Sequence, residues 1–351
     1  MPIFTLRQAR PLGLLCAALM VIAAGYPLAC PAQEGAYRVI EKQHLDGDVK
    51  WDYLTIDGEH RHLFITHGDQ VEVFDLDKKQ VVGNIPAHGV HGVAIAPEFD
   101  RGYVTNGNGN SVTFFALSTL QVVGSAPTGK KPDGIAYDPA SKRVFAVNGG
   151  AASVTPIDAA TGKALAAIPL GGSPEFLAAD GTGRLFINLE DKNQLVVIDT
   201  RKLLLTHRYD LSAGCDEPAG LSIDPAAQRL FVGCHNQKMA VVDANTGKIV
   251  DALPIGRGSD ATAFDAAAKL AFSSNSDGTL NVIDASDARH YRVKQTVTTM
   301  PRARTLAIDP ASHKIYLVAA EAEAVDPAAT QPPPRRPRLQ AGTFTLITVG
   351  P

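Results

Sequence analysis

The chain has 351 residues and a formal net charge of −3, with 45% hydrophobic residues, 20% charged residues, 31 glycines and 23 prolines. This composition indicates a globular protein rich in turns and long enough to bury a large core. It excludes a strongly basic chain of the kind that binds nucleic acid through its overall charge.

The N-terminus has the pattern of a secretory signal peptide. Arg7 and Arg10 precede an apolar run from Pro11 to Gly25, and the small-residue stretch YPLACPAQ follows. A basic segment, a short apolar segment and a small-residue end predict cleavage after Ala32 rather than a membrane-spanning helix. Because no later run approaches the ~20 apolar residues of a spanning helix, we expect a periplasmic or secreted protein with no transmembrane segment after cleavage.

A lipid anchor is the alternative for this N-terminus. Cys30 would be the acylated residue, but Pro27 stands where such a motif has an aliphatic residue. Cleavage of residues 1–32 removes two arginines and no acidic residue, so the mature chain, residues 33–351, carries a formal charge of −5. The mature protein is therefore mildly acidic.

Two of the four cysteines, Cys215 and Cys234, remain in the mature chain. An even pair in an oxidising compartment favours a disulfide. A metal site that combines the cysteines with His235 is the alternative, although structural zinc sites normally have four ligands.

A repeat of about 40 residues runs through the mature chain. Each copy reads as four short alternating strands, for example GIAYDPASKRVFAVNGGAASVTPIDAATGKALAAIPLG, and most copies carry an aspartate seven residues before an aromatic of the second strand. The corresponding anchor positions are Asp57, Ala96, Asp138, Asp180, Asp224, Asp265 and Asp309. This period and strand pattern are typical of β-propeller blades, so we predict an all-β, seven-bladed propeller of four-stranded antiparallel blades.

The seventh copy lacks a fourth strand. The stretch AYRVIEKQHLDG near the start of the mature chain matches that missing strand. We therefore expect the N-terminal strand to complete the last blade, which closes the ring and removes an open sheet edge. The Pro-rich segment 321–342 interrupts the same blade between its second and third strands and is predicted to be a long surface loop.

The stretch GYVTNGNGNSV, residues 102–112, contains a G-x-G but is followed by the β-type sequence SVTFFAL. A phosphate-binding loop would need a helix there, because the helix N-terminus supplies the N–H groups. We predict a hairpin instead.

The motif YVTN, residues 103–106, and its looser copies FAVN and FSSN resemble the YVTN-repeat, YncE-like family of exported bacterial β-propellers. The resemblance covers essentially the whole mature chain and implies the propeller fold. Better-characterised members of that family are linked to nucleic-acid binding. More distant propellers are lactonases, lyases and quinoprotein-associated subunits.

Two sets of positions are expected to meet at one end of the propeller channel. Residues just before the first strand's core and just after the second strand converge there in every blade. The first set is Asp52, His91, Asp133, Glu175, Ala219, Asp260 and Arg304; the second is His67, Asn106, Asn148, Leu189, Cys234, Asn275 and Ala319. We predict that their polar members, with His235, form a ligand-binding mouth.

The chemistry of this mouth leaves several functions open. Carboxylates and neutral imidazoles hold divalent cations, which gives His91, Asp133, Glu175 and Asp260 as candidate metal ligands. Arg304 could pair with a substrate carboxylate. We expect a monomer that binds a small molecule or a protein through the mouth, as a recognition or scaffold protein. A metal-assisted hydrolase, lactonase or lyase is the first alternative, although a propeller end is also polar simply because its loops meet water.

Sequence-independent DNA binding is the second alternative, and it follows from the family resemblance. Phosphate binding needs a basic surface. The local candidates are Lys130, Lys131 and the run RRPR at residues 335–338, but such runs are more often solvated surface.

Overall fold

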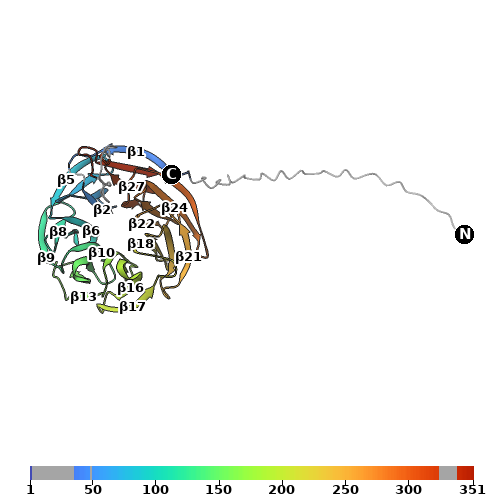
Figure 1. Cartoon of the computed structure of the whole chain (residues 1–351), viewed down its shortest axis with the longest axis horizontal. Helices are drawn as coiled ribbons and strands as arrows, with labels where there is room; N and C mark the ends of the chain where they lie inside the picture. Colours follow the sequence, from blue (N-terminus) through green and yellow to red (C-terminus); the bar gives the residue numbers. More distant parts are fainter. Residues whose placement is uncertain (2–34, 48–49, 324–337) are drawn as a thin grey trace, which may run out of the picture. The chain divides into compact units, whose positions relative to one another are not determined.

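The chain from Gly35 to Pro351 forms seven four-stranded antiparallel sheets. The structure, a computed structural model, describes residues 1, 35–47, 50–323 and 338–351. The predicted signal peptide and the alternative lipid site at Cys30 lie outside the described residues. Figure 1 shows the sheets as blades arranged around a common centre, with β2, β6, β10, β18 and β22 on the inner side. The predicted seven-bladed propeller is confirmed.

The first six blades follow the chain order from the inner to the outer strand. Blade 1 contains β2 (Trp51–Asp57), β3 (His62–His67), β4 (Gln70–Asp75) and β5 (Gln80–Pro86). Blade 2 contains β6 (Val90–Ala96), β7 (Arg101–Asn106), β8 (Ser111–Ala116) and β9 (Val122–Pro127). Blade 3 contains β10 (Pro132–Asp138), β11 (Arg143–Asn148), β12 (Ser153–Asp158) and β13 (Ile168–Pro169).

The next three blades repeat this order. Blade 4 contains β14 (Pro174–Ala179), β15 (Arg184–Leu189), β16 (Gln194–Asp199) and β17 (Leu204–Asp210). Blade 5 contains β18 (Pro218–Asp224), β19 (Arg229–Cys234), β20 (Lys238–Asp243) and β21 (Ile249–Pro254). Blade 6 contains β22 (Ser259–Asp265), β23 (Leu270–Asn275), β24 (Thr279–Asp287) and β25 (His290–Thr298).

Blade 7 joins the two ends of the propeller chain. It contains β26 (Leu306–Asp309), β27 (Lys314–Ala319) and β28 (Thr345–Gly350), with β1 (Arg38–His44) as the outer strand. β1 runs antiparallel to β28 from the pair Arg38–Gly350 to the pair His44–Thr345. The prediction that the N-terminal strand completes the last blade is therefore confirmed.

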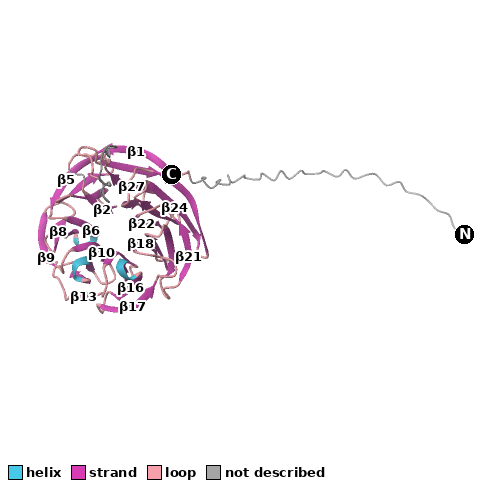
Figure 2. Ribbon diagram, in the orientation of Figure 1, coloured by secondary structure: helices cyan, strands magenta, loops and turns pink. Residues whose placement is uncertain are grey.

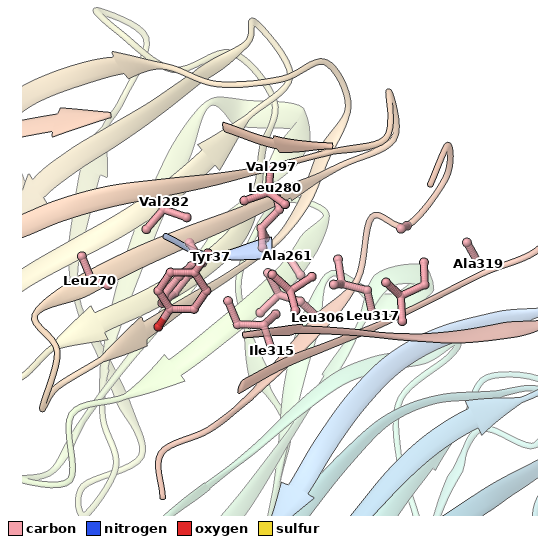
Figure 3. Packing of buried hydrophobic residues seen from close by; sticks show 14 residues of the cluster. Tyr37, Ala261, Leu270, Leu280, Val282, Val297, Leu306, Ile315, Leu317 and Ala319 are labelled. Carbon is pink, nitrogen blue, oxygen red and sulfur yellow. The ribbon is translucent and has the colours of Figure 1, made fainter. Parts of the chain in front are cut away.

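Tyr37 anchors this closure from the position before β1. Its ring is 5% exposed and packs edge-on against Phe272, with 5.3 Å between ring centroids. Figure 3 shows it among apolar side chains of blade 6, such as Leu270 and Val282, and of blade 7, such as Ile315. The N-terminal segment thus adds both backbone hydrogen bonds and buried apolar surface.

The repeated aspartates hold the turn between the first two strands of a blade. Asp224 is buried, and its Oδ1 accepts the backbone N–H groups of Ala226 and Ala227 at 3.0 and 3.1 Å. Gln228 then takes a left-handed φ of 55°. This Asx-type turn explains why the sequence repeats an aspartate at this point.

The GYVTNGNGNSV stretch forms the predicted hairpin between β7 and β8. Asn110, with a φ of 48°, is the residue of its turn in the left-handed region. Gly107 and Gly109 do not have positive φ, so the turn does not need them for that reason.

In the part of the chain that the structure describes, helix is limited to three short 3-10 turns, which are drawn cyan in Figure 2: η1 (Pro97–Phe99), η2 (Gly149–Ala151) and η3 (Glu190–Lys192). Among the described residues, no helix has the length and apolar character needed to cross a membrane. The described ends of the Pro-rich segment between β27 and β28 pair through a single bridge from Ala322 to Leu339; residues 324–337 lie outside the description.

Candidate functional site

Five of the predicted mouth residues occupy the same place in their blades. Each is the second residue of an inner strand, so the strand order carries them to one end of the channel. They are Asp52 in β2, His91 in β6, Asp133 in β10, Glu175 in β14 and Asp260 in β22. Arg304 lies just before β26. We call these six residues the mouth ring; Ala219 holds the equivalent position in β18 and brings no polar group.

Asp52, His91 and Asp133 form a compact group from blades 1, 2 and 3. The Nδ1 atom of His91 lies 2.5 Å from Oδ2 of Asp52 and 3.7 Å from Oδ1 of Asp133. One ligand-type atom from each residue lies within 4.8 Å of the other two. Burial alone would lower the pKa of the His91 imidazole, but the hydrogen bond to Asp52 and the charges of Asp133 and Asp52 outweigh it and raise that pKa.

The raised pKa values of three carboxyl groups show that the negative charge of the mouth ring is poorly compensated. Burial, followed by the charge of Asp52, raises the pKa of Asp133 to about 6. Burial and the charges of Asp133 and Asp260 raise the pKa of Glu175 to about 9. Burial also raises the pKa of Asp260 to about 6, although Arg304 opposes this shift. A buried carboxyl keeps its proton when neighbouring carboxylates repel its charge.

Arg304 supplies the guanidinium of the mouth ring. Its Nε lies 3.4 Å from Oδ2 of Asp260, and that carboxylate is the main cause of its raised pKa. One arginine thus faces four carboxyl groups. The electrostatic balance of the mouth ring remains acidic.

Tyr53 and Phe176, which follow Asp52 and Glu175 directly in the sequence, contact each other near the mouth ring. Tyr53 comes from blade 1 and Phe176 from blade 4, and their ring centroids lie 4.7 Å apart. The two rings thus meet across the channel, because these blades are not neighbours in the propeller. Burial, then the charges of Asp133, Glu175, Asp52 and Asp260, raise the pKa of Tyr53 well above its ordinary value.

The Tyr53 hydroxyl is buried and has no hydrogen-bond partner in the described part of the chain. It points to the backbone of blade 3, where a Cβ added to Gly134 would lie 3.1 Å from it. The repeat gives no sign of this residue, since the aligned positions of blades 2 and 3 are glycines, Gly92 and Gly134.

Four other predicted mouth residues, three asparagines and one histidine, form side-chain hydrogen bonds within their own blades. Asn106 donates through Nδ2 to Ser111 and Thr113, and Asn148 makes the same two bonds in blade 3. Asn275 bonds to Thr279 and Asn281. His67 is 2% exposed and its Nδ1 lies 3.1 Å from Oε2 of Glu72. Each of these four side chains is engaged with the neighbouring strand of its blade, and none is hydrogen-bonded to the mouth ring in the described part of the chain; their role in binding stays a prediction.

The predicted disulfide between Cys215 and Cys234 is confirmed. It ties the segment before β18 to the end of β19, so the cysteine and histidine metal site does not form. His235 lies beside it with Nδ1 2.9 Å from Oε2 of Glu217 and 3.8 Å from Oε1 of Glu190. This group is more open to solvent, since the side chain of Glu217 is 63% exposed.

A pocket of about 260 Å³ opens beside the Asp52 and His91 side chains. Its other lining residues are Lys50, Trp51, Gly68, Gly89, Val90 and Asn108. The pocket gives solvent access to the side chains that blades 1 and 2 contribute to the mouth ring.

Three solved structures have a similar fold. A chain of Kuenenia stuttgartiensis hydrazine synthase matches with a TM-score of 0.68 and 15% identity, over 78% of this chain and 94% of its own. The U3-55K structure matches with a TM-score of 0.70 and 11% identity, over 89% of this chain and 99% of its own. The RRP9 WD40 repeats match with a TM-score of 0.73 and 11% identity, over 90% of this chain and 100% of their own. These similarities establish the propeller fold alone. No protein-family model and no curated protein matches the sequence.

Gly107 makes room for the His91 imidazole, which gives a direct test of the mouth geometry. A Cβ on Gly107 would lie 2.6 Å from Nε2 of His91. We expect Gly107→Ala to push the ring away from Asp52 and to lower the His91 pKa towards its ordinary value, as measured by NMR titration. Gly109→Ala in the same turn is the control, because its Cβ would meet nothing nearer than 3.2 Å. An unchanged His91 titration in Gly107→Ala would contradict the geometry.

Proposed function

We propose that this protein is an exported binding protein that takes up a cationic ligand at the mouth of its propeller channel. The observation that carries the proposal is the meeting of four carboxyl groups, Asp52, Asp133, Glu175 and Asp260, from four inner strands. They are accompanied by one arginine, Arg304, whose Nε lies 3.4 Å from Asp260. A partly buried acidic group of this kind favours a positively charged ligand.

Cation binding would remove an electrostatic cost that arises from the carboxyl groups of the mouth ring. Partly buried carboxylates that repel one another are destabilising, and a cation between them replaces repulsion by attraction. The raised pKa of Glu175, about 9, indicates that this group is protonated at neutral pH without a ligand. We therefore expect binding to release protons and to strengthen as pH rises.

Export is supported by two observations. The N-terminal residues 1–32 have the pattern of a signal peptide, and the Cys215–Cys234 disulfide is typical of proteins outside the reducing cytosol. Membership of the YVTN-repeat group is part of the same proposal and rests on the YVTN motif in β7.

The acidic mouth ring gives less support to the two alternative functions, DNA binding and metal-assisted catalysis. An acidic ring repels phosphate groups, so DNA binding would have to use another surface. A metal-assisted hydrolase, lactonase or lyase needs a bound cation first, and the same binding experiment therefore comes before any test of catalysis.

Thermal unfolding of the full chain at low ionic strength tests the proposal. Zn²⁺, Ca²⁺, spermidine and putrescine form the cationic panel, with phosphate and citrate as anions. We expect at least one cation to raise the melting temperature in the wild type, with a smaller shift in Asp260→Asn. Stabilisation by anions alone, or by no member of the panel, would refute a cationic ligand.

A further inference from the structure

We propose that Asp52, His91 and Asp133 form a binding site for a single divalent transition-metal ion of the Zn²⁺ class. This inference deepens the proposed function, because it names one ligand for the acidic mouth, and it rests on that proposal. The three residues come from adjacent blades. Their ligand atoms lie within 4.8 Å of one another.

The distances fit a small metal ion. Zn²⁺ binds nitrogen and carboxylate oxygen at about 2.0–2.2 Å, which places its ligand atoms roughly 3–3.6 Å apart. The 3.7 Å from His91 Nδ1 to Asp133 Oδ1 is near this range, and the 2.5 Å contact to Asp52 needs to open. Small side-chain rotations on fixed strands are enough for both changes.

The backbone around the three residues is held firmly. Thr105 in β7 accepts the Gly92 N–H at 2.8 Å and donates to the Asp133 carbonyl at 2.6 Å, which links blades 2 and 3. Gly107 lies against the Nε2 side of His91, so the imidazole presents Nδ1 to both carboxylates. A site of this kind is preorganised on rigid strands.

The Tyr53 hydroxyl is an independent sign that a ligand belongs here. Among the described residues this buried polar atom has no hydrogen-bond partner, and after burial the charge of Asp133 is the largest cause of the raised Tyr53 pKa. Buried polar groups are nearly always hydrogen-bonded, so an unsatisfied one needs an explanation. A water molecule on the metal ion, or a carboxylate oxygen turned towards it, would accept this hydrogen bond.

The ligand set also favours one class of metal. Two carboxylates and an imidazole suit Zn²⁺ and its first-row neighbours, whereas Ca²⁺ and Mg²⁺ prefer oxygen ligands alone. The pocket of about 260 Å³ beside Asp52 and His91 leaves room for water in the remaining coordination positions.

Calorimetric titration of the full chain with Zn²⁺, supported by the visible spectrum of Co²⁺, tests the inference. We expect one Zn²⁺ per chain, at least tenfold weaker binding of Ca²⁺ and Mg²⁺, and a roughly 100-fold loss of Zn²⁺ affinity in His91→Ala and in Asp133→Asn. His91→Gln provides a second variant of similar size, and each variant's thermal unfolding shows whether it is folded.

The matched control is His290→Ala. His290 also pairs with an aspartate, Asp287 at 3.1 Å, but its side chain is 82% exposed on the β24–β25 turn. This variant should bind Zn²⁺ like the wild type. Binding that survives both His91 variants, or that disappears with Glu217→Gln in the more exposed group, would overturn the inference.

The two proposals fail differently. If spermidine stabilises the protein and Zn²⁺ does not bind, the mouth takes a cation but the metal site is refuted. If Zn²⁺ does not bind and no other cation of the panel stabilises the protein, both proposals are refuted.

Discussion

Deletion of residues 36–46 should lower the melting temperature by about 10 °C or more, or prevent the protein from accumulating in folded form. The deletion removes β1, which pairs with β28 along blade 7. It also removes Tyr37 from the core between blades 6 and 7, and loss of a large buried aromatic costs about 3–5 kcal/mol by itself. The exposed edge of β28 would in addition favour aggregation. Circular dichroism melts and size-exclusion chromatography measure both effects.

The control for this deletion is a chain that begins at Gly35. It lacks the N-terminal segment but keeps β1, and it should unfold at the temperature of the longer chain. The melting temperature of Tyr37→Ala should lie between those of the deletion variant and the chain that begins at Gly35. A deletion variant as stable as the Gly35 chain would contradict closure of the ring by β1.

Replacement of three mouth acids, Asp133→Asn, Glu175→Gln and Asp260→Asn together, should stabilise the protein and abolish its response to cations. The amides keep the shape and remove the repulsion. At pH 8 without ligand, we expect about 1–3 kcal/mol more stability after allowance for partial solvent access, or about 2–6 °C in melting temperature. The cation-induced shift seen in the wild type should disappear. Binding sites commonly carry such a cost in stability.

The stability gained by the triple variant should increase with pH. The pKa of Glu175 rises from 4.5 to about 9 on folding, so the folded state favours its protonated form. Its favourable contribution is complete below pH 4.5 and is lost as pH rises towards 9. The pKa values of Asp133 and Asp260 rise from 3.8 to about 6 on folding, so these two groups add to the loss of stability between pH 3.8 and pH 6.

The stability difference between the triple variant and the wild type should therefore be small near pH 4 and increase towards pH 9. Thermal melts across this range measure it. Asp251→Asn, a change at a partly buried position of blade 5 outside the mouth ring, is the control and should show no such trend. A triple variant less stable than the wild type at pH 8 would show that the carboxylates are not in mutual repulsion.

The fold was predictable because its signals are local and repeated. The aspartate turns, such as Asp224 with Ala226 and Ala227, recur in most blades, and the position of each strand follows from them. The missing fourth strand of blade 7 was predictable for the same reason. The mouth ring also follows from the repeat, since one register places Asp52, His91 and Asp133 at equivalent points.

Side-chain direction was harder to predict than strand position. Asn106 and His91 lie near the same strand ends, yet Asn106 turns towards Ser111 and Thr113 within blade 2 while His91 turns to Asp52 of blade 1. The Tyr53–Phe176 contact links two blades that are distant in the sequence. No local sequence pattern predicts such a pair. Contacts that cross the channel depend on the closed ring, which exists only in three dimensions.

The most direct measurement is a crystal structure of the protein grown with the cation that stabilises it best. We predict density for that cation in the mouth, in contact with at least two of Asp52, Asp133, Glu175 and Asp260. For a metal ion, anomalous scattering would identify it beside His91. A cation found only at the exposed Glu190, Glu217 and His235 group, or a mouth that holds water alone under conditions where the cation stabilises the protein, would contradict the proposed function.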